Sequence, residues 1–187
     1  MKPTKENIRL MLKESNAIED VWDRYALVQA GRAWRYLDRF DRISPMEIKV
    51  VHDILMVGQP LEQRHRGAWR DIPVWIGRDK KSDPPLVIQS KIQDLCDHIN
   101  KTIENQDNNH QPTHCHVKFE DIHPFVDGNG RVGRIILNWH CLRLGMPLLV
   151  YTHTDRRTYY RLFPGYRAME MERVMKAMGL GGFDLLS

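Results

Sequence analysis

The sequence predicts an all-α domain, a compact helical bundle with one short β-hairpin. Apolar residues recur at helical spacing through most of the 187-residue chain. Only residues 67–77 combine Trp, Ile and Val with flanking glycines and an internal proline, a pattern typical of a strand. Hydrophobic residues make up 42% of the chain, which is enough for a core, and the length suits a single domain.

The N-terminal part of the chain is predicted to be helical. Residues 7–40 carry apolar side chains at helical spacing. After them, Ser44 can cap a helix, Pro45 fits its first position, and Glu47 completes a capping box. We expect the helix that begins there to end near Gly58.

The middle of the chain changes character. Residues 67–77 are predicted to form an edge strand or hairpin, because Pro73 would break a helix, and residues 80–85 a loop. An amphipathic helix follows, with five apolar residues on one face: Ile88, Ile92, Leu95, Ile99 and Ile103. The polar residues 104–113 are predicted to form a mobile loop.

The last third is predicted to be helical again. A short helix ends at Ile122, and a glycine-rich turn leads into a longer helix that stops at Gly145 and Pro147. Two further helices are predicted over residues 155–163 and 166–178.

Charge and cysteine content disfavour several classes of protein. The 28 Lys and Arg against 24 Asp and Glu leave a net charge of +4, which suits a phosphate-bearing ligand but is too small for a nucleic-acid scaffold. No stretch approaches the roughly 18 apolar residues of a membrane helix, and no secretory signal is evident. Three widely spaced cysteines form no disulfide framework. We therefore expect a cytoplasmic protein that binds neither nucleic acid nor membrane.

Residues 123–134 read His-Pro-Phe-Val-Asp-Gly-Asn-Gly-Arg-Val-Gly-Arg. Gly128 and Gly130 allow a tight turn that brings main-chain N–H groups against an anion. The helix that begins near Asn129 adds the positive end of its dipole. This backbone is typical of a phosphoryl or nucleotidyl transfer site.

The side chains of this segment suit the same chemistry. Arg131 and Arg134 are three residues apart, so they share a helix face and direct two guanidinium groups to one place. Asp127 offers one hard oxygen ligand, suited to Mg²⁺ shared with substrate phosphates. His123 has an ordinary pKa of about 6.5, which suits a general base near neutrality. Phe125 is expected to face inward.

The segment resembles the signature of the Fic family, His-Pro-Phe-x-Asp/Glu-Gly-Asn-Gly-Arg-x-x-Arg, and matches it at every fixed position. Residues 116–122 resemble the helix that leads into the signature, and residues 156–162 the family's closing helix. The likeness covers residues 43–187, preceded by N-terminal helices over residues 1–40. A single domain over 1–187 is expected.

The resemblance implies a Fic-like helical bundle that acts as a protein adenylyltransferase. Such an enzyme transfers AMP from ATP to a Ser, Thr or Tyr hydroxyl of a target protein. On the matching positions, His123 would deprotonate the hydroxyl, and Asp127 would hold Mg²⁺ between the α- and β-phosphates. Self-modification and a homodimer remain open.

The resemblance also assigns the phosphate-binding residues. The backbone around Gly128, Asn129 and Gly130 would form the anion hole where charge develops. Arg131 and Arg134 would grip the β- and γ-phosphates.

Residues 67–77 resemble the family's flap, whose edge pairs with the target backbone and sets the acceptor hydroxyl over the histidine. An ordinary exposed hairpin is the alternative. The residues expected to dock the target are Val74, Trp75 and Ile76. Tyr160, or its neighbour Tyr159, would border the adenine, with core burial as the alternative.

Residues 15–20, Ser-Asn-Ala-Ile-Glu-Asp, resemble the inhibitory pattern Ser/Thr-x-x-x-Glu-Gly/Asn of many Fic proteins. The resemblance implies that Ser15 and Glu19 are inhibitory and that Glu19 pairs with Arg134. A carboxylate bound to that arginine competes with the γ-phosphate. Asp20 departs from the family's Gly or Asn.

Other functions stay open at this point. The chain could transfer a different nucleotide monophosphate, remove AMP with Glu19 orienting water, or bind nucleotides without catalysis. A zinc site is disfavoured, because His114 and His116 are two residues apart and do not share a helix face. The histidines and cysteine that could suggest such a site are His110, His114, Cys115, His116 and His123.

Overall fold

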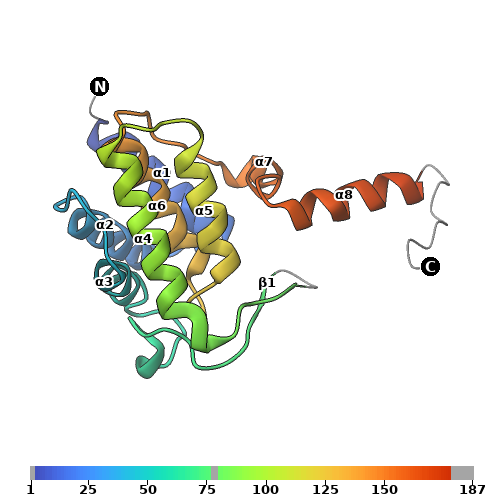
Figure 1. The fold of residues 1–187 in the computed structure, drawn as a ribbon, viewed down its shortest axis with the longest axis horizontal. Coiled ribbons are helices and arrows are strands. Elements are labelled where there is room, and N and C mark those ends of the chain that lie inside the picture. The colour runs from blue at the N-terminus through green and yellow to red at the C-terminus, as the bar shows by residue number, and fades with distance from the viewer. Residues whose placement is uncertain (1–2, 77–79, 178–187) are drawn as a thin grey trace.

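The computed structural model describes residues 3–76 and 80–177, and it is mostly helical, which confirms the predicted all-α class (Figure 1). The longer helices are α1 (Lys5–Ile18), α2 (Arg24–Leu37), α3 (Pro45–Leu55), α4 (Ile88–Glu104), α5 (Gln111–Ile122), α6 (Asn129–Arg143) and α8 (Pro164–Ala177). The short elements are η1 (Gln63–His65), β1 (Trp75–Ile76), β2 (Lys80–Lys81), η2 (Pro85–Val87), η3 (His153–Asp155) and α7 (Arg156–Tyr160).

Helix α6 lies at the centre of the bundle, with α1, α4 and α5 around it in Figure 1. Most of its residues are buried, including Val132, Ile135 and Trp139 of the hydrophobic core. Its N-terminus carries the Gly-Asn-Gly segment, so the candidate site is built on a helix that the core holds from several sides.

The predicted helical stretch 7–40 is divided into α1 and α2. Helix α1 ends in a Schellman motif: Val21 N donates to Asn16 O and Asp20 N donates to Ala17 O, both at 3.0 Å. Asp20 takes the left-handed conformation of this motif, with φ 56°. Asp23 then caps α2 by accepting from Ala26 N at 2.7 Å.

The predicted start of α3 is confirmed. Ser44 Oγ accepts from Met46 N at 3.2 Å, and the Glu47 carboxylate accepts from Ser44 N at 2.9 Å. Helix α3 ends at Leu55, and a turn follows to Gly58, whose φ is 77°. The amphipathic α4 is also confirmed, with its apolar face in the core.

The strand prediction for residues 67–77 is mostly wrong. Of the described residues 67–76, only those of β1 form a strand, and β1 pairs antiparallel with β2, which lies in the predicted loop 80–85. Upstream of β1, the carbonyl of Ile72 accepts from the buried Arg70 side chain at 2.9 Å, and Pro73 has no N–H to donate. Both features remove these residues from strand pairing. Gly77, the predicted end of the strand, lies outside the described residues.

The C-terminal elements differ in length from the prediction. Helix α7 is shorter than the predicted 155–163 helix, and α8 begins at Pro164 rather than at 166. Met178, the predicted end of the last helix, lies outside the described residues. Helix α8 extends away from the bundle in Figure 1.

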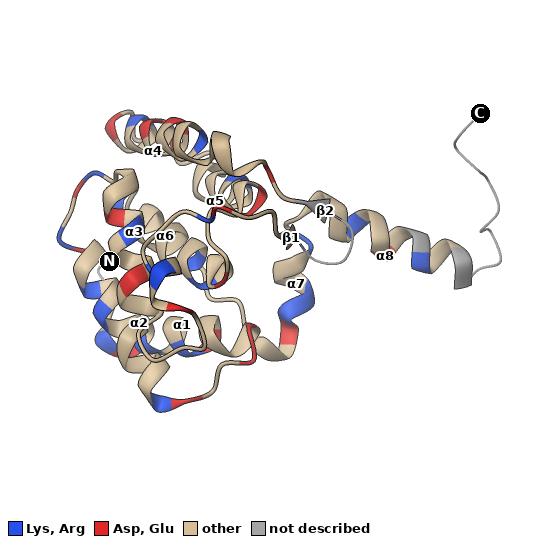
Figure 2. Cartoon of the chain, turned by 90° about the horizontal axis from the view of Figure 1, so that it is seen from below, with Lys and Arg blue, Asp and Glu red and all other residues tan. Residues whose placement is uncertain are grey.

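Helix α5 begins at Gln111, inside the predicted loop 104–113, and the mobility of that loop stays a prediction. In the view of Figure 2, acidic and basic residues are interspersed over the helices of the bundle. Within residues 3–76 and 80–177, no helix is long and apolar enough to cross a membrane.

Candidate active site

The turn between α5 and α6 holds the first half of the signature. His123 ends α5 in a left-handed conformation (φ 50°, ψ 63°), which non-glycine residues adopt rarely. Gly128, with φ 79°, directly precedes α6. The Asn129 side chain accepts from Phe125 N and donates to Phe125 O, both at 2.9 Å. The Asn129 amide therefore braces the turn, and its main-chain N–H points out of the start of α6.

A buried histidine of α3, His52, supports this turn. Its ring stacks on Phe125 with centroids 3.8 Å apart, and Phe125 is fully buried as predicted. Gly67 N donates to His52 Nδ1 at 2.9 Å, so Nε2 carries the proton and donates to Asp127 O at 3.1 Å. Burial lowers the pKa of His52 to about 4. His52 was not predicted as a site residue, and its signal in the sequence is a histidine on the apolar face of its helix.

No side chain in the described part of the chain caps the N-terminus of α6. The first N–H groups of this helix, on Asn129, Gly130 and Arg131, therefore have no helical acceptor. The aligned peptide dipoles add positive partial charge at the same end. This end of α6 favours an anion.

The carboxylate of Glu19 lies at this helix end. A Cβ placed on Gly130 would overlap Glu19 Oε1. The same oxygen accepts from Arg134 Nη2 at 2.8 Å, although the Glu19 side chain remains 37% exposed. The Glu19 carboxylate therefore lies beside the first turn of α6 and is bonded to Arg134.

Arg134 is buried and joins α6 to the end of α1. Its Nε donates to Ser15 Oγ at 2.9 Å, and its Nη2 donates to Ser15 O at 2.8 Å as well as to Glu19. The ring of Tyr159 lies 4.9 Å from the guanidinium carbon. The structure therefore brings the predicted Ser15 and Glu19 together with Arg134, which is more than a hundred residues away in the sequence.

Arg131 is also buried but contacts other elements. Its Nη1 donates to Gln59 Oε1 at 3.2 Å and its Nη2 contacts Met56 Sδ, both residues in the turn after α3. Arg131 is thus held from the α3 side of the site, and Arg134 from the α1 side.

The His123 side chain is held for one tautomer. Its Nδ1 lies 3.2 Å from Glu120 O, so it donates there and leaves the lone pair on Nε2. Burial lowers the pKa of His123, and the nearby Arg70 charge acts in the same direction. The imidazole is therefore neutral near pH 7. Burial also raises the pKa of the neighbouring Glu120 to about 8.

Asp127 presents a carboxylate to solvent beside these groups. One oxygen accepts from Gly128 N at 2.6 Å, the other lies 3.9 Å from Arg131 Nη2, and the side chain is 57% exposed. A single exposed carboxylate fits Mg²⁺ that takes its remaining ligands from water and phosphate oxygens. Among the described residues, no three His, Cys, Asp or Glu side chains could hold a metal on their own.

The two tyrosines proposed to border an adenine are in different positions. Tyr159 is buried between Arg134 and His116, and its hydroxyl lies 3.1 Å from His116 Nε2. Tyr160 is half-buried and contacts the rings of Tyr159 and Tyr166, each with centroids 5.4 Å apart. Core burial therefore accounts for Tyr159, and a role of Tyr160 beside adenine stays a prediction.

The hairpin is fastened at its base. Val74 N donates to Ser82 Oγ at 3.1 Å, and Ser82 N donates to Val74 O at 3.0 Å. Trp75 is 65% exposed, and Ile76 lies in β1. Docking of a target on this hairpin stays a prediction.

Arg70 is a second site residue that was not predicted from the sequence. It is 2% exposed, and its Nε donates to His123 O at 2.7 Å. Its only signal in the sequence is a single arginine within an apolar, strand-like segment.

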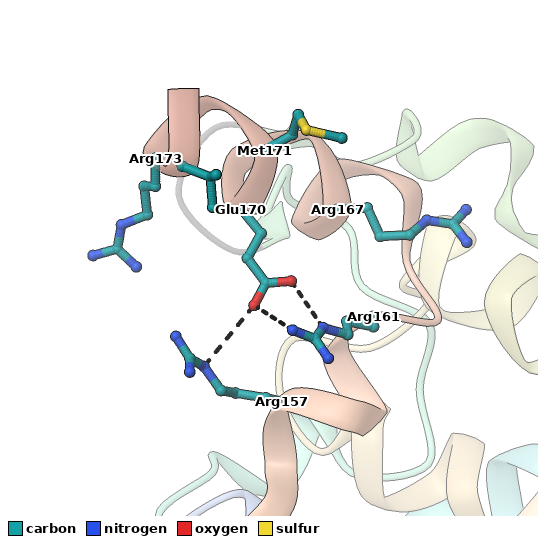
Figure 3. A pocket seen from close by; sticks show the side chains of 7 residues that line it. Arg157, Arg161, Arg167, Glu170, Met171 and Arg173 are labelled. Carbon is teal, nitrogen blue, oxygen red and sulfur yellow. Dashed lines mark hydrogen bonds and ion pairs between the residues drawn. The ribbon is translucent and has the colours of Figure 1, made fainter. Parts of the chain in front are cut away.

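A hollow of about 850 Å³ lies between α7 and α8, apart from the signature (Figure 3). Glu170 there accepts from Arg161 at 2.8 and 3.1 Å, and it lies 4.0 Å from Arg157. None of the residues that line it belongs to the signature. The lining residues are Arg157, Arg161, Arg167, Glu170, Met171, Arg173 and Val174.

The fold and this geometry define a helical domain built around an uncapped, glycine-rich helix N-terminus flanked by a histidine and a carboxylate. Residues 42–141, more than half of the chain, match the Fic/DOC family. The chain belongs to this family.

Proteins similar to this chain share the fold over most of its length. A protein adenylyltransferase fic-1 from Caenorhabditis elegans is 31% identical over 122 residues, which are 64% of this chain and 23% of that protein. A Fic domain containing signaling protein from Bacteroides thetaiotaomicron has a TM-score of 0.73 at 16% identity, covering 89% of this chain and 73% of that chain. Fic-1 from C. elegans has a TM-score of 0.72 at 21% identity, covering 96% and 66%. This chain therefore spans only about a quarter of the curated relative.

Proposed function

We propose that this chain is a protein adenylyltransferase that transfers AMP from ATP to a hydroxyl of a target protein, and that Glu19 restrains it. The family, the name of the C. elegans relative and the geometry around α6 support this proposal.

The N-terminus of α6 receives the phosphates of ATP. Its uncapped N–H groups and dipole favour an anion, and Arg131 and Arg134 flank the same helix end. The charge that develops at the α-phosphate is stabilised by main-chain N–H groups from Gly128 to Gly130. Once Glu19 leaves Arg134, the triphosphate can be held by main-chain N–H groups and two arginines.

His123 is the general base. Its Nε2 keeps the lone pair because Nδ1 donates to Glu120 O, and its lowered pKa keeps the ring neutral. Nε2 removes the proton of the acceptor hydroxyl as the hydroxyl oxygen attacks the α-phosphorus. A new P–O bond forms, the bond to the bridging oxygen breaks, and pyrophosphate leaves.

Asp127 is the residue that would hold Mg²⁺. The ion would supply charge neutralisation to the α- and β-phosphates when bound. The carboxylate is oriented for this by the Gly128 N–H, and His52 fixes the Asp127 carbonyl behind it.

The hairpin formed by β1 and β2 positions the target. Its strand edge pairs with an extended target segment, and the exposed Trp75 contacts the segment's side chains. Trp75 and the neighbouring Val74 and Ile76 then place the acceptor hydroxyl near His123.

Glu19 restrains the enzyme by occupying the phosphate site. Its carboxylate accepts from Arg134 and lies over Gly130, where the γ-phosphate would need the same donors. ATP can then bind only with its phosphates displaced from the position for attack.

The observation that carries the proposal is His123, held in one tautomer by Glu120 O, together with an uncapped helix end beside which the Glu19 carboxylate lies. The test incubates the Glu19→Gly variant with Mg²⁺ and ATP labelled at either the α- or the γ-phosphorus. We expect label to remain on protein only from the α-position. Retention of γ-label would show phosphate transfer instead, and loss of both labels with intact ATP binding would show a silent nucleotide-binding regulator.

Parallel reactions with UTP and CTP identify the nucleotide donor. Incubation of AMP-modified protein with wild type tests AMP removal, in which Glu19 would orient water. Rapid loss of AMP in wild type but not in Glu19→Gly would make removal the main activity.

A further inference from the structure

We propose that Arg70 is a positioning residue that ties the hairpin to the histidine turn, so that the target-docking edge and the catalytic base are held by one buried guanidinium. This inference rests on the proposed function for its kinetic consequences. Its structural part is testable without any activity.

The hydrogen bonds of Arg70 connect two separate segments. On the hairpin side, Nη1 donates to Ile72 O at 2.9 Å and Nη2 donates to Asp83 O at 2.6 Å. These carbonyls lie on either side of the β1–β2 pair. The base of the hairpin is therefore closed by the same side chain from both ends.

On the turn side, Arg70 contacts three consecutive residues. Nε donates to His123 O at 2.7 Å and Nη2 to Ile122 O at 3.2 Å. The main-chain N of Arg70 also donates to Pro124 O at 2.9 Å. The peptide units before and after His123 are thus both fixed by Arg70.

His123 depends on such support because of its backbone conformation. At φ 50° the residue is in a region where side chains are disfavoured, so neighbouring contacts must hold it there. The direction of Nε2 follows from that backbone and from the bond between Nδ1 and Glu120 O. A released His123 carbonyl would let the base turn away from the acceptor hydroxyl.

Only arginine suits this position. Its planar group carries three nitrogens in fixed directions, which reach four carbonyls on two segments. A lysine would keep the positive charge but offer a single nitrogen. Arg70→Lys therefore separates geometry from charge, and Arg70→Gln removes both.

Arg143 provides a matched control at the other end of α6. It too donates to main-chain carbonyls, with Nε and Nη2 bonded to Phe40 O at 3.0 and 2.8 Å. It contacts neither the hairpin nor the signature turn through any hydrogen bond between described residues. Arg143→Lys therefore reports the general cost of losing such an arginine.

The experiment compares Arg70→Lys, Arg70→Gln and Arg143→Lys in the Glu19→Gly background. We expect ATP affinity to stay within about twofold in all three, because the N-terminus of α6 is untouched. The transfer rate should fall at least tenfold in both Arg70 variants and less than twofold in Arg143→Lys. The KM for a protein target should rise in the Arg70 variants alone.

The pH profile separates a positioning role from a loss of folding. The Arg70 charge lowers the pKa of His123, so its removal in Arg70→Gln should move the acid limb of the rate to higher pH, whereas Arg70→Lys should keep its position. Unchanged rates and profiles would overturn the proposal. Transfer rates that fall only in proportion to ATP affinity and melting temperature would also overturn the proposal.

If the Glu19→Gly parent transfers no AMP, that result refutes the proposed function alone. Hydrogen exchange then still tests whether Arg70 holds the base of the hairpin. Val74 N and Ser82 N are protected by hydrogen bonds at the hairpin base. Both should exchange at least tenfold faster in Arg70→Lys than in Arg143→Lys. Equal exchange rates in the two variants would refute the proposal that Arg70 holds the base of the hairpin.

Discussion

The carboxylate of Glu19 lies against Gly130, so closely that a side chain at that glycine would overlap its Oε1 atom. Arg134 Nη2 bonds the same oxygen at 2.8 Å. The last turn of α1 and the first turn of α6 thus meet at one anion. The proposed phosphate site and the Glu19 carboxylate share the Arg134 donor. Substitutions at Glu19 or Gly130 should therefore affect both nucleotide binding and the free energy of unfolding.

Replacing Glu19 should release the phosphate site. A hydrogen bond to a charged group contributes about 1.5–3 kcal/mol, so we expect Glu19→Gly to raise the apparent affinity for ATP at least tenfold. Isothermal titration calorimetry measures this directly. Glu19→Gln keeps the side chain's shape without its charge and should give an intermediate value.

The matched control for this prediction is Glu14→Gln. Glu14 also lies near the end of α1, but its carboxylate accepts from His153 N at 2.9 Å, away from Gly130. We expect no change in ATP affinity. An equal gain in Glu14→Gln and Glu19→Gln would mean that loosening α1, rather than removing an anion, opens the site.

A side chain at Gly130 should be tolerated only without Glu19. Gly130→Ala should destabilise the wild type by about 1–3 kcal/mol, as overpacking does, and should cost clearly less in the Glu19→Gly background. Urea unfolding of the wild type, Gly130→Ala, Glu19→Gly and the double variant gives the coupling free energy between the two positions. Gly31→Ala, in α2, would bring the new Cβ only into ordinary contact with Arg35 Nη1 at 3.5 Å, so it should be neutral or stabilising. Additive effects of the Gly130 and Glu19 changes would contradict the contact.

The departure from the family pattern at Asp20 should be compatible with the fold. Asp20 occupies a left-handed position, which Gly, Asn and Asp tolerate and β-branched residues do not. Asp20→Asn and Asp20→Gly should therefore change the free energy of unfolding by less than about 1 kcal/mol, since the pair with Arg156 is exposed.

Asp20→Val should cost about 1–2 kcal/mol because the valine side chain clashes in this conformation. Asp41→Val serves as its control, at an exposed position without a positive φ. Equal costs at the two positions in chemical denaturation would show that the backbone conformation of Asp20 is not the cause.

Much of the α-helical structure is predictable because its signals are local. Ser44 and Glu47 meet within one turn of helix, and the Gly-Asn-Gly segment lies directly at the start of α6. The length of β1 was not predictable, because the carbonyl of Ile72 bonds a buried arginine rather than a partner strand.

The residues of the signature were predictable from the sequence, but the residues that hold the signature turn in place were not. His52 and Arg70 hold the signature turn through contacts with residues that are 52 or more positions away. No spacing in the sequence indicates such bonds. The meeting of Glu19 with Arg134 was implied by the resemblance to a family, and the residues alone did not reveal it.

Stability should fall as the solution is acidified from pH 6.5. Burial lowers the pKa values of His52, His116 and His140 to about 4, 3 and 4. Below pH 6.5 the unfolded chain takes up protons that the native histidines do not accept. The contribution of these histidines to the free energy of unfolding is therefore present above pH 6.5 and is lost on acidification.

Glu120 has the opposite effect. Its raised pKa of about 8 stabilises the native state below pH 4.5, and that contribution is lost as the pH rises through 8. Between pH 4.5 and 6.5 three histidines outweigh one carboxyl group. In His140→Gln, the slope of unfolding free energy against pH should decrease by about 1.4 kcal/mol per pH unit. An unchanged slope would show that His140 protonates in the native state.

The intact mass of Glu19→Gly after incubation with ATP and Mg²⁺, measured beside Glu19→Gly combined with His123→Ala, tests the central claim most directly. We expect addition of AMP to Glu19→Gly and no addition to the double variant. Equal addition to both proteins would contradict the role of His123 as the base.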